Sequence, residues 1–170
     1  MRVASGDVQA EDVERFRALT LYAESPDTVR AARDMAGSAL RDWELHSLVD
    51  DVRVVVSELV SNAIVHATPD PHLARPGAAR RVDVTLWKVP RWLFLGVADE
   101  DSHPPMLPAS DPFAPQWLGH VPEAVLPDSG RGLAIVFKLA DALWWTRTLS
   151  GGKTVRCRFD LEGRTPGEQP

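Results

Sequence analysis

Residues 47–67 constrain the fold of this chain more than any other segment, because their pattern is helical and they are apolar on nearly every side. A helix of this composition is stable only when it is largely buried, as happens when it packs against a sheet. Pro69 ends the pattern, since proline lacks the amide that a continuing helix needs. The most regular apolar stripe consists of Leu48, Val52, Val55, Leu59 and Ala63.

Two neighbouring segments predict the strands on which such a helix could pack. Residues 80–88 alternate between apolar and polar side chains, whereas residues 92–98 are a nearly continuous apolar run, and Pro90 lies between them. Residues 150–152 are typical of a hairpin turn. The full set of predicted strands is 13–23, 80–88, 92–98, 142–149 and 153–160.

Two further helices are predicted on either side of these elements. Ser25 can cap the first, Pro26 suits its first turn, and Asp27 complements the helix dipole. Its apolar stripe ends near Glu44, and a short helix over 132–141 opens at a glycine pair. The stripe consists of Val29, Ala32, Ala36, Leu40 and Trp43.

Residues 102–129 contain seven of the 14 prolines, which excludes regular structure over most of that span. A connection this long is usually functional and often a lid. The order of elements predicts an α+β fold, a two-layer α/β sandwich with an antiparallel or mixed sheet and its helices on one face. One domain is expected over 13–160, between flexible segments at 1–12 and 161–170.

Composition excludes several functional classes. The net charge of -5 leaves no basic face for nucleic acid, and the single cysteine, Cys157, excludes a disulfide framework and a cysteine-ligated zinc site. No apolar stretch approaches the roughly 20 residues that span a bilayer. A soluble cytoplasmic protein that contacts neither membrane nor nucleic acid is therefore expected.

Glu58, Asn62 and His66 recur every four residues on the predicted helix 47–67, so they form a polar line away from its apolar stripe. An ordinary solvated helix face is the alternative, and periodicity alone does not decide between the two. The apolar surroundings favour a site, because polar groups in a largely buried helix need partners.

Two other polar segments are weak signals by themselves. Asp99 follows an apolar strand, where a carboxylate can accept a hydrogen bond from a ligand's amine, although an acidic turn is the simpler interpretation. Gly130, Arg131 and Gly132 open a helix, and free amides at such a start suit phosphate oxygens. Residues 152–154 are interpreted first as part of a hairpin turn.

In this order and spacing, the segments together resemble the GHKL superfamily of ATPases, whose domain has the Bergerat fold. The resemblance covers residues 16–159. The stretch from Ser57 to Ala67 resembles the N-box, Val97-Ala98-Asp99 the first glycine box, residues 128–133 the second glycine box, and Gly152-Lys153-Thr154 the terminal Gly-Thr element.

Within that superfamily the chain looks most like the small bacterial anti-sigma factor serine/threonine kinases and their actinobacterial relatives. The resemblance implies Mg²⁺ and ATP as cofactors, with Glu58 as general base and Asn62 holding the metal through its amide oxygen. It further implies that Asp99 binds the adenine amine, that residues 130–132 (Gly130, Arg131 and Gly132) contact the phosphates, and that Thr154 approaches the adenine through water. His66 often has a counterpart in these kinases, although a packed, hydrogen-bonded histidine is the favoured interpretation here.

The resemblance also implies partners: a sigma factor and an antagonist of the STAS type, with a homodimer possible. One departure is that no glycine follows Asp99 in residues 100–105, which reduces backbone freedom there and puts lid closure in question. A nucleotide-binding switch without catalysis is therefore the alternative function. The detached catalytic domain of a histidine kinase is disfavoured, since no phosphoacceptor helix precedes residue 13.

Overall fold

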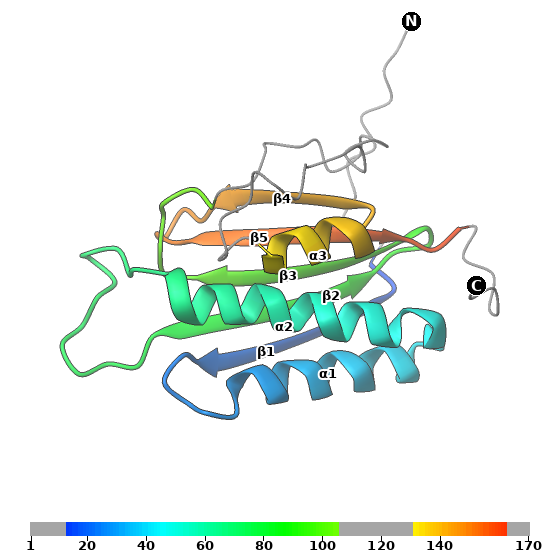
Figure 1. Cartoon of the computed structure of the whole chain (residues 1–170), viewed down its shortest axis with the longest axis horizontal. Helices are drawn as coiled ribbons and strands as arrows, with labels where there is room; N and C mark the ends of the chain where they lie inside the picture. The colour runs from blue at the N-terminus through cyan, green and yellow to red at the C-terminus, as the bar shows by residue number, and fades with distance from the viewer. Residues whose placement is uncertain (1–12, 106–130, 163–170) are drawn as a thin grey trace, which may run out of the picture.

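The computed structural model describes residues 13–105 and 131–162 and arranges them as one sheet with helices packed on it (Figure 1). The expected flexible segment at 1–12 lies outside the described residues, as do residues 163–170 of the one expected at 161–170 and residues 106–129 of the predicted lid at 102–129. In chain order the elements are β1 (Arg15–Tyr22), α1 (Thr28–Asp42), the 3₁₀ turn η2 (His46–Leu48), α2 (Val49–His66), β2 (Arg81–Lys88), β3 (Trp92–Asp99), α3 (Arg131–Leu139), β4 (Ala142–Arg147) and β5 (Lys153–Asp160).

The five strands form a single sheet in the order β1-β2-β3-β5-β4, and each neighbouring pair is antiparallel. The choice that the sequence left open between an antiparallel and a mixed sheet is thereby settled. β5 lies between β3 and β4 although it comes last along the chain. This insertion places Lys153 directly opposite Asp99.

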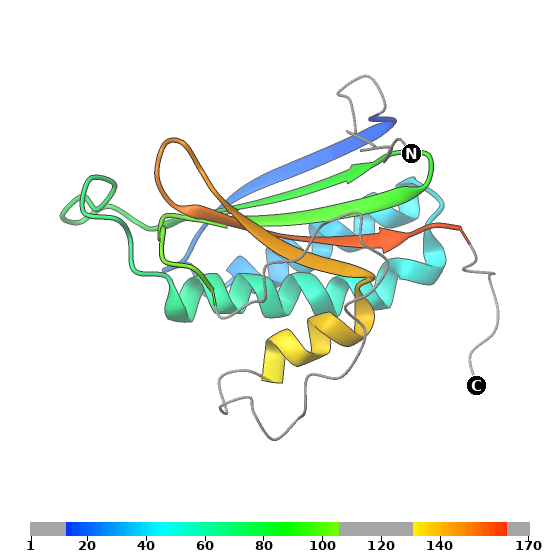
Figure 2. The same cartoon turned by 90° about the horizontal axis from the view of Figure 1, so that it is seen from above.

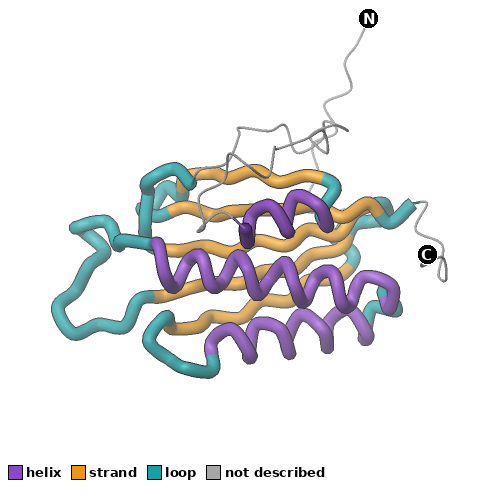
Figure 3. The backbone as a smooth tube through the Cα atoms, in the orientation of Figure 1, coloured by secondary structure: helices purple, strands orange, loops and turns teal. Residues whose placement is uncertain are grey.

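The three α-helices of the described residues cover one face of the sheet, which confirms the two-layer α+β sandwich (Figures 2 and 3). α2 runs along the middle of that face between α1 and α3 (Figure 1). Among the described helices, none is both long and apolar enough to cross a membrane.

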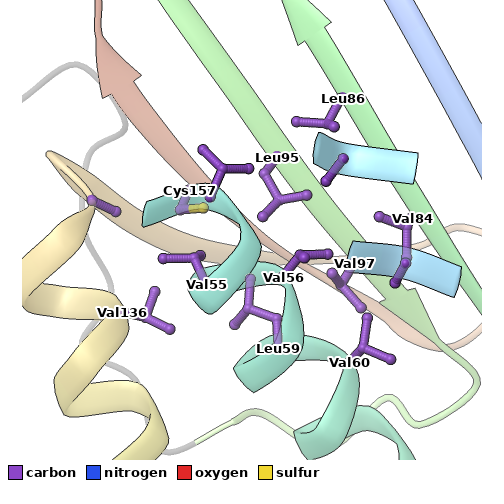
Figure 4. Packing of buried hydrophobic residues seen from close by; sticks show 14 of the residues in the cluster. Val55, Val56, Leu59, Val60, Val84, Leu86, Leu95, Val97, Val136 and Cys157 are labelled. Atoms are coloured by element: carbon purple, nitrogen blue, oxygen red, sulfur yellow. The ribbon is translucent and has the colours of Figure 1, made fainter. Parts of the chain in front are cut away.

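α2 supplies the centre of the core, as its composition predicts. Its residues Val52, Val55, Val56, Leu59 and Val60 are at most 3% exposed, and they pack against the apolar side chains of β2, β3 and β5 (Figure 4). Burying each such side chain stabilises the fold by about 1.5–3 kcal/mol. The core also contains Cys157, whose thiol pKa is raised by burial.

α1 begins two residues later than the sequence suggested. Its first residue is Thr28, and its N-cap, Asp27, makes no side-chain capping bond. The Ser25 carbonyl instead accepts the Thr28 amide at 3.3 Å, and the Thr28 hydroxyl donates to the Tyr22 carbonyl at 2.5 Å. These bonds fold residues 23–27 into a turn, so Ser25 is not the cap.

The opposite face of the sheet carries an aromatic cluster around Phe94. The Trp87 ring stacks on Phe94 with centroids 5.1 Å apart, and Trp92 and Trp144 each meet Phe94 edge-on at 6.2 Å. Trp43, by contrast, packs against the main core under the helices. Trp87, Trp92 and Trp144 are therefore strand-surface residues, and Trp43 belongs to the core.

The hairpin between β4 and β5 depends on Gly152. This residue has φ +82°, and a Cβ added to it would lie 2.1 Å from the Asp99 carbonyl oxygen. Only glycine allows both the left-handed backbone and the close approach of β5 to the end of β3. The turn therefore fixes the relative position of Asp99 and Lys153.

Replacing Gly152 with alanine should destabilise the protein by clearly more than the same change at Gly77. Gly77 has φ +76° but no atom within 4 Å of its added Cβ, so Gly77→Ala isolates the backbone cost of about 1–2 kcal/mol. Gly152→Ala has the same backbone cost and in addition a clash between the new Cβ and the Asp99 carbonyl oxygen, which can be relieved only if the backbone moves. Chemical denaturation of both variants measures the difference, and equal losses would contradict the close packing.

Candidate functional site

α2 presents Glu58 and Asn62 beside its sheet-facing residues. Both side chains are half-buried, and neither forms a hydrogen bond or ion pair with any described residue. His66 is the last residue of α2 and is exposed, so the expectation of a packed histidine is wrong. The helix ends there because Ala67 adopts an extended backbone.

α3 brings Gly132 against Glu58. A Cβ added to Gly132 would lie 2.4 Å from Glu58 Oε2, so any larger residue would displace the carboxylate. The helix begins at Arg131, one residue before the predicted start. Gly130 and the Arg131 side chain lie outside the described residues. The structure thus joins two of the segments that the sequence singled out, the Glu58 helix and the glycine-rich helix start.

Asp99 is the last residue of β3 and shares the helix-covered face of the sheet with Leu95 and Val97. Its side chain is 7% exposed. Oδ1 accepts hydrogen bonds from the Asp101 amide at 2.9 Å and from Lys153 Nζ at 3.1 Å. Burial raises the pKa of Asp99, and these two hydrogen bonds oppose that rise.

Lys153 is a site residue that sequence reasoning missed. Its ammonium also contacts Asp101, at 3.0 Å from Oδ2 and 3.1 Å from the carbonyl oxygen, and its side chain is 8% exposed. A signal was present, because Lys153 alternates with Val155 and Cys157 and therefore belongs to the buried face of β5. A lysine on such a face needs an anionic partner.

Thr154 lies on the other face of the sheet. A Cβ added to Gly96 would meet Thr154 Cγ2 at 3.5 Å, and Gly96 points away from the helices. The expectation that Thr154 approaches the adenine is therefore wrong, since successive strand residues point to opposite faces. Lys153, its neighbour, takes the position beside Asp99.

Asp101 is buried and anchors the chain that follows β3. Desolvation raises the pKa of its carboxyl group, but hydrogen bonds from the His103 amide, the His103 ring and Lys153 outweigh it and lower this pKa to about 2. Asp101 is therefore ionised at neutral pH and balances the Lys153 ammonium.

Asp70, in the loop between α2 and β2, is a second residue that sequence reasoning missed. Its carboxylate accepts hydrogen bonds from the Ser102 amide at 3.1 Å, from the Ser102 hydroxyl and from the Gly152 amide at 3.0 Å. The Ser102 hydroxyl and the Gly152 amide lower the pKa of Asp70. Asp70 thus ties the loop after α2 to the residues that follow β3 and precede β5.

The chain directly after Asp99 is held in place without glycine. Asp101 bonds to Lys153 and Ser102 bonds to Asp70, so residues 99–102 have partners on two neighbouring segments. This arrangement agrees with the reduced backbone freedom that the sequence implied.

Comparison with known proteins identifies the family. Residues 22–159 match the family model described as a histidine kinase-like ATPase domain. No curated protein matches the chain significantly. The match covers most of the chain, including α2, the end of β3, the start of α3 and the β4–β5 hairpin. The chain belongs to the histidine kinase-like ATPase domain family, within the GHKL superfamily.

Proposed function

We propose that this domain binds Mg-ATP and transfers its γ-phosphoryl group to a serine of a STAS-type antagonist, as an anti-sigma factor kinase of the bacterial cytoplasm. The contact between Glu58 and Gly132 carries the proposal, because it places a carboxylate without a described partner beside the first turn of α3. Free amides at a helix start favour phosphate oxygens.

The residues around this contact suit the parts of Mg-ATP. The Asn62 side chain is half-buried, and its amide oxygen has no described partner. Magnesium prefers oxygen ligands and is usually held by a few protein oxygens together with the phosphates of its nucleotide. The metal would neutralise phosphate charge during transfer. Among the described residues, no three acidic, histidine or cysteine side chains cluster as a separate metal site.

Glu58 would then act on the partner rather than on the nucleotide. In this mechanism its carboxylate accepts the proton of a serine hydroxyl as that oxygen attacks the γ-phosphorus, while the bond from this phosphorus to the β–γ bridging oxygen breaks and ADP leaves. Asp99 would accept the adenine amine at the other end of the site. Arg131 would add positive charge at the phosphates. A sigma factor would bind the same protein, which would act as a homodimer.

A second candidate function is a nucleotide-dependent switch without catalysis. The observation that favours it is the anchoring of residues 99–102 through Asp70 and Lys153. Such a site would bind nucleotide and change its affinity for a regulator without turnover. Nucleotide binding by the wild type without phosphate transfer to any STAS-type protein would identify this function.

Mg-ATP should stabilise the wild type in a thermal melt, by about 2.7 kcal/mol at a hundred times the dissociation constant. Asn62→Ala should lose most of this stabilisation, because it removes the proposed metal ligand. It should also respond equally to ATP with magnesium and to ATP with a chelator.

Ser57→Ala is the matched control on the same helix, since the Ser57 hydroxyl donates to the Arg53 carbonyl at 2.7 Å and stays within α2. This variant should keep the full magnesium-dependent shift. A wild type that shows no shift with Mg-ATP would remove the nucleotide proposal altogether.

Glu58→Gln should keep the Mg-ATP shift and lose phosphate transfer by at least about a hundredfold, because the amide cannot accept the serine proton. The assay follows phosphoserine on purified STAS-type proteins, with their serine-to-alanine variants as controls. Undiminished transfer by Glu58→Gln would exclude Glu58 as the base. Acid-labile phosphate on a partner histidine would instead indicate histidine kinase chemistry.

A further inference from the structure

Lys153 is placed where a buried cation is costly. Its side chain is 8% exposed, and its ammonium lies between the carboxylates of Asp99 and Asp101, each also at most 8% exposed. Burying charges requires dehydration that only close, well-oriented partners offset. Asp101 alone already balances the charge of the Lys153 ammonium. The additional hydrogen bond from Lys153 to Asp99 therefore matters mainly because it limits which ligand groups Asp99 can still accept.

The hydrogen-bonding capacity of Asp99 is divided unequally between its two oxygens. A carboxylate offers about four lone-pair sites, two on each oxygen. The Asp101 amide and Lys153 Nζ occupy both sites of Oδ1, at 2.9 and 3.1 Å. Among the described residues, none donates to Oδ2. The carboxylate therefore presents one available acceptor atom to a ligand.

Adenine and guanine differ in the number of hydrogen-bond donors that they present to a carboxylate. The hydrogen-bonding edge of adenine offers one donor group, its exocyclic amine, next to an acceptor nitrogen. The same edge of guanine offers two adjacent donors, a ring N–H and an exocyclic amine, which fit the two oxygens of one carboxylate together. A carboxylate with both oxygens available favours guanine, whereas one with a single available oxygen loses that advantage.

We propose that Lys153 is a specificity-determining residue that makes the site select adenine over guanine nucleotides by keeping Asp99 Oδ1 occupied. The inference rests on the proposed function, because it assumes that Asp99 faces the base. Lys153 acts through Asp99 and is a positioning residue, with no contact to the reacting phosphate.

The fold holds this arrangement in place. Antiparallel pairing sets Lys153 opposite Asp99, and Gly152 lets β5 approach the Asp99 carbonyl so closely that any side chain there would clash. Asp101 holds the ammonium from its other side through both its carboxylate and its carbonyl oxygen. The occupied state of Oδ1 is thus built into the strand ends and precedes ligand binding.

Lys153 also favours the ionised form of Asp99. Burial raises the pKa of this carboxyl group, and the hydrogen bond and charge of Lys153 lower it. Removing Lys153 therefore raises the pKa of Asp99 further. Since protonated Asp99 loses acceptor capacity for the adenine amine, ATP affinity should then decline at a higher pH as the solution is acidified.

The test compares Asp101→Asn with the double variant Asp101→Asn and Lys153→Met. In the wild type, Asp99, Asp101 and Lys153 together carry a net charge of -1. The double variant keeps this net charge of -1, so no unbalanced lysine or additional carboxylate is buried and the fold is protected. Titration calorimetry with Mg-ATP and Mg-GTP gives the affinity ratio of each protein. Lys138→Met, the same change at an exposed lysine of α3, is the control.

We expect the ATP-to-GTP affinity ratio to fall about tenfold when Lys153→Met is added to Asp101→Asn, the effect of one hydrogen bond gained by guanine. Replacing Lys153 with arginine instead of methionine keeps a cationic donor and should therefore preserve the preference for ATP. The pH at which ATP affinity declines should rise in the double variant. A lysine with only a structural role would weaken both nucleotides alike at every pH.

An unchanged ratio together with an unchanged pH profile would overturn the role of Lys153 while leaving ATP binding by the wild type intact. Failure of the wild type to bind Mg-ATP is a different result, because it would remove the proposed function and this inference with it. Loss of folding in the double variant, detected by its melt, moves the test to Lys153→Arg. If the ATP-to-GTP affinity ratio of Lys153→Arg falls as far as is expected for Lys153→Met, the proposal is also overturned.

Discussion

The structure depends on the burial of α2 against the centre of the sheet. Val56 and Val60 face the strands, and this contact fixes the rotation of the helix about its axis. Once that rotation is set, Glu58 is directed toward α3, where Gly132 leaves room for it. The apolar contacts that stabilise the domain therefore also orient its polar residues, so stability and site geometry have one origin.

Side-chain periodicity was sufficient to predict most of the architecture. Each strand and helix of the described residues was expected close to where it lies, because alternation and helical stripes are properties of a local segment. The antiparallel order of the sheet was not determined in the same way. Pairing β5 between β3 and β4 is a long-range choice that no local pattern contains. The start of α1 was missed because the Thr28 hydroxyl bonds to β1, a tertiary contact that outweighs a capping preference.

The same distinction applies to the site. Glu58 and Gly132 were expected from motifs, and the fold brings them into contact. Lys153 and Asp70 were missed because their roles arise from partners far along the chain, at Asp99, Ser102 and Gly152. The motif also pointed to Thr154, one residue away from the side chain that faces the site. Moving by one residue along a strand places the side chain on the opposite face of the sheet. A motif match that is wrong by one residue therefore identifies the wrong side chain on a strand.

The position of β5 has a consequence for how the molecule is made. β3 lies at the middle of the sheet, yet one of its two neighbours is the last of the described strands in the order of synthesis. Until that strand arrives, β3 presents an unpaired edge, and Asp99 has no lysine beside it. A nascent chain can thus form the β1-β2-β3 meander with α1 and α2 early, whereas sheet closure and the ion pair at its end arise together in one late step.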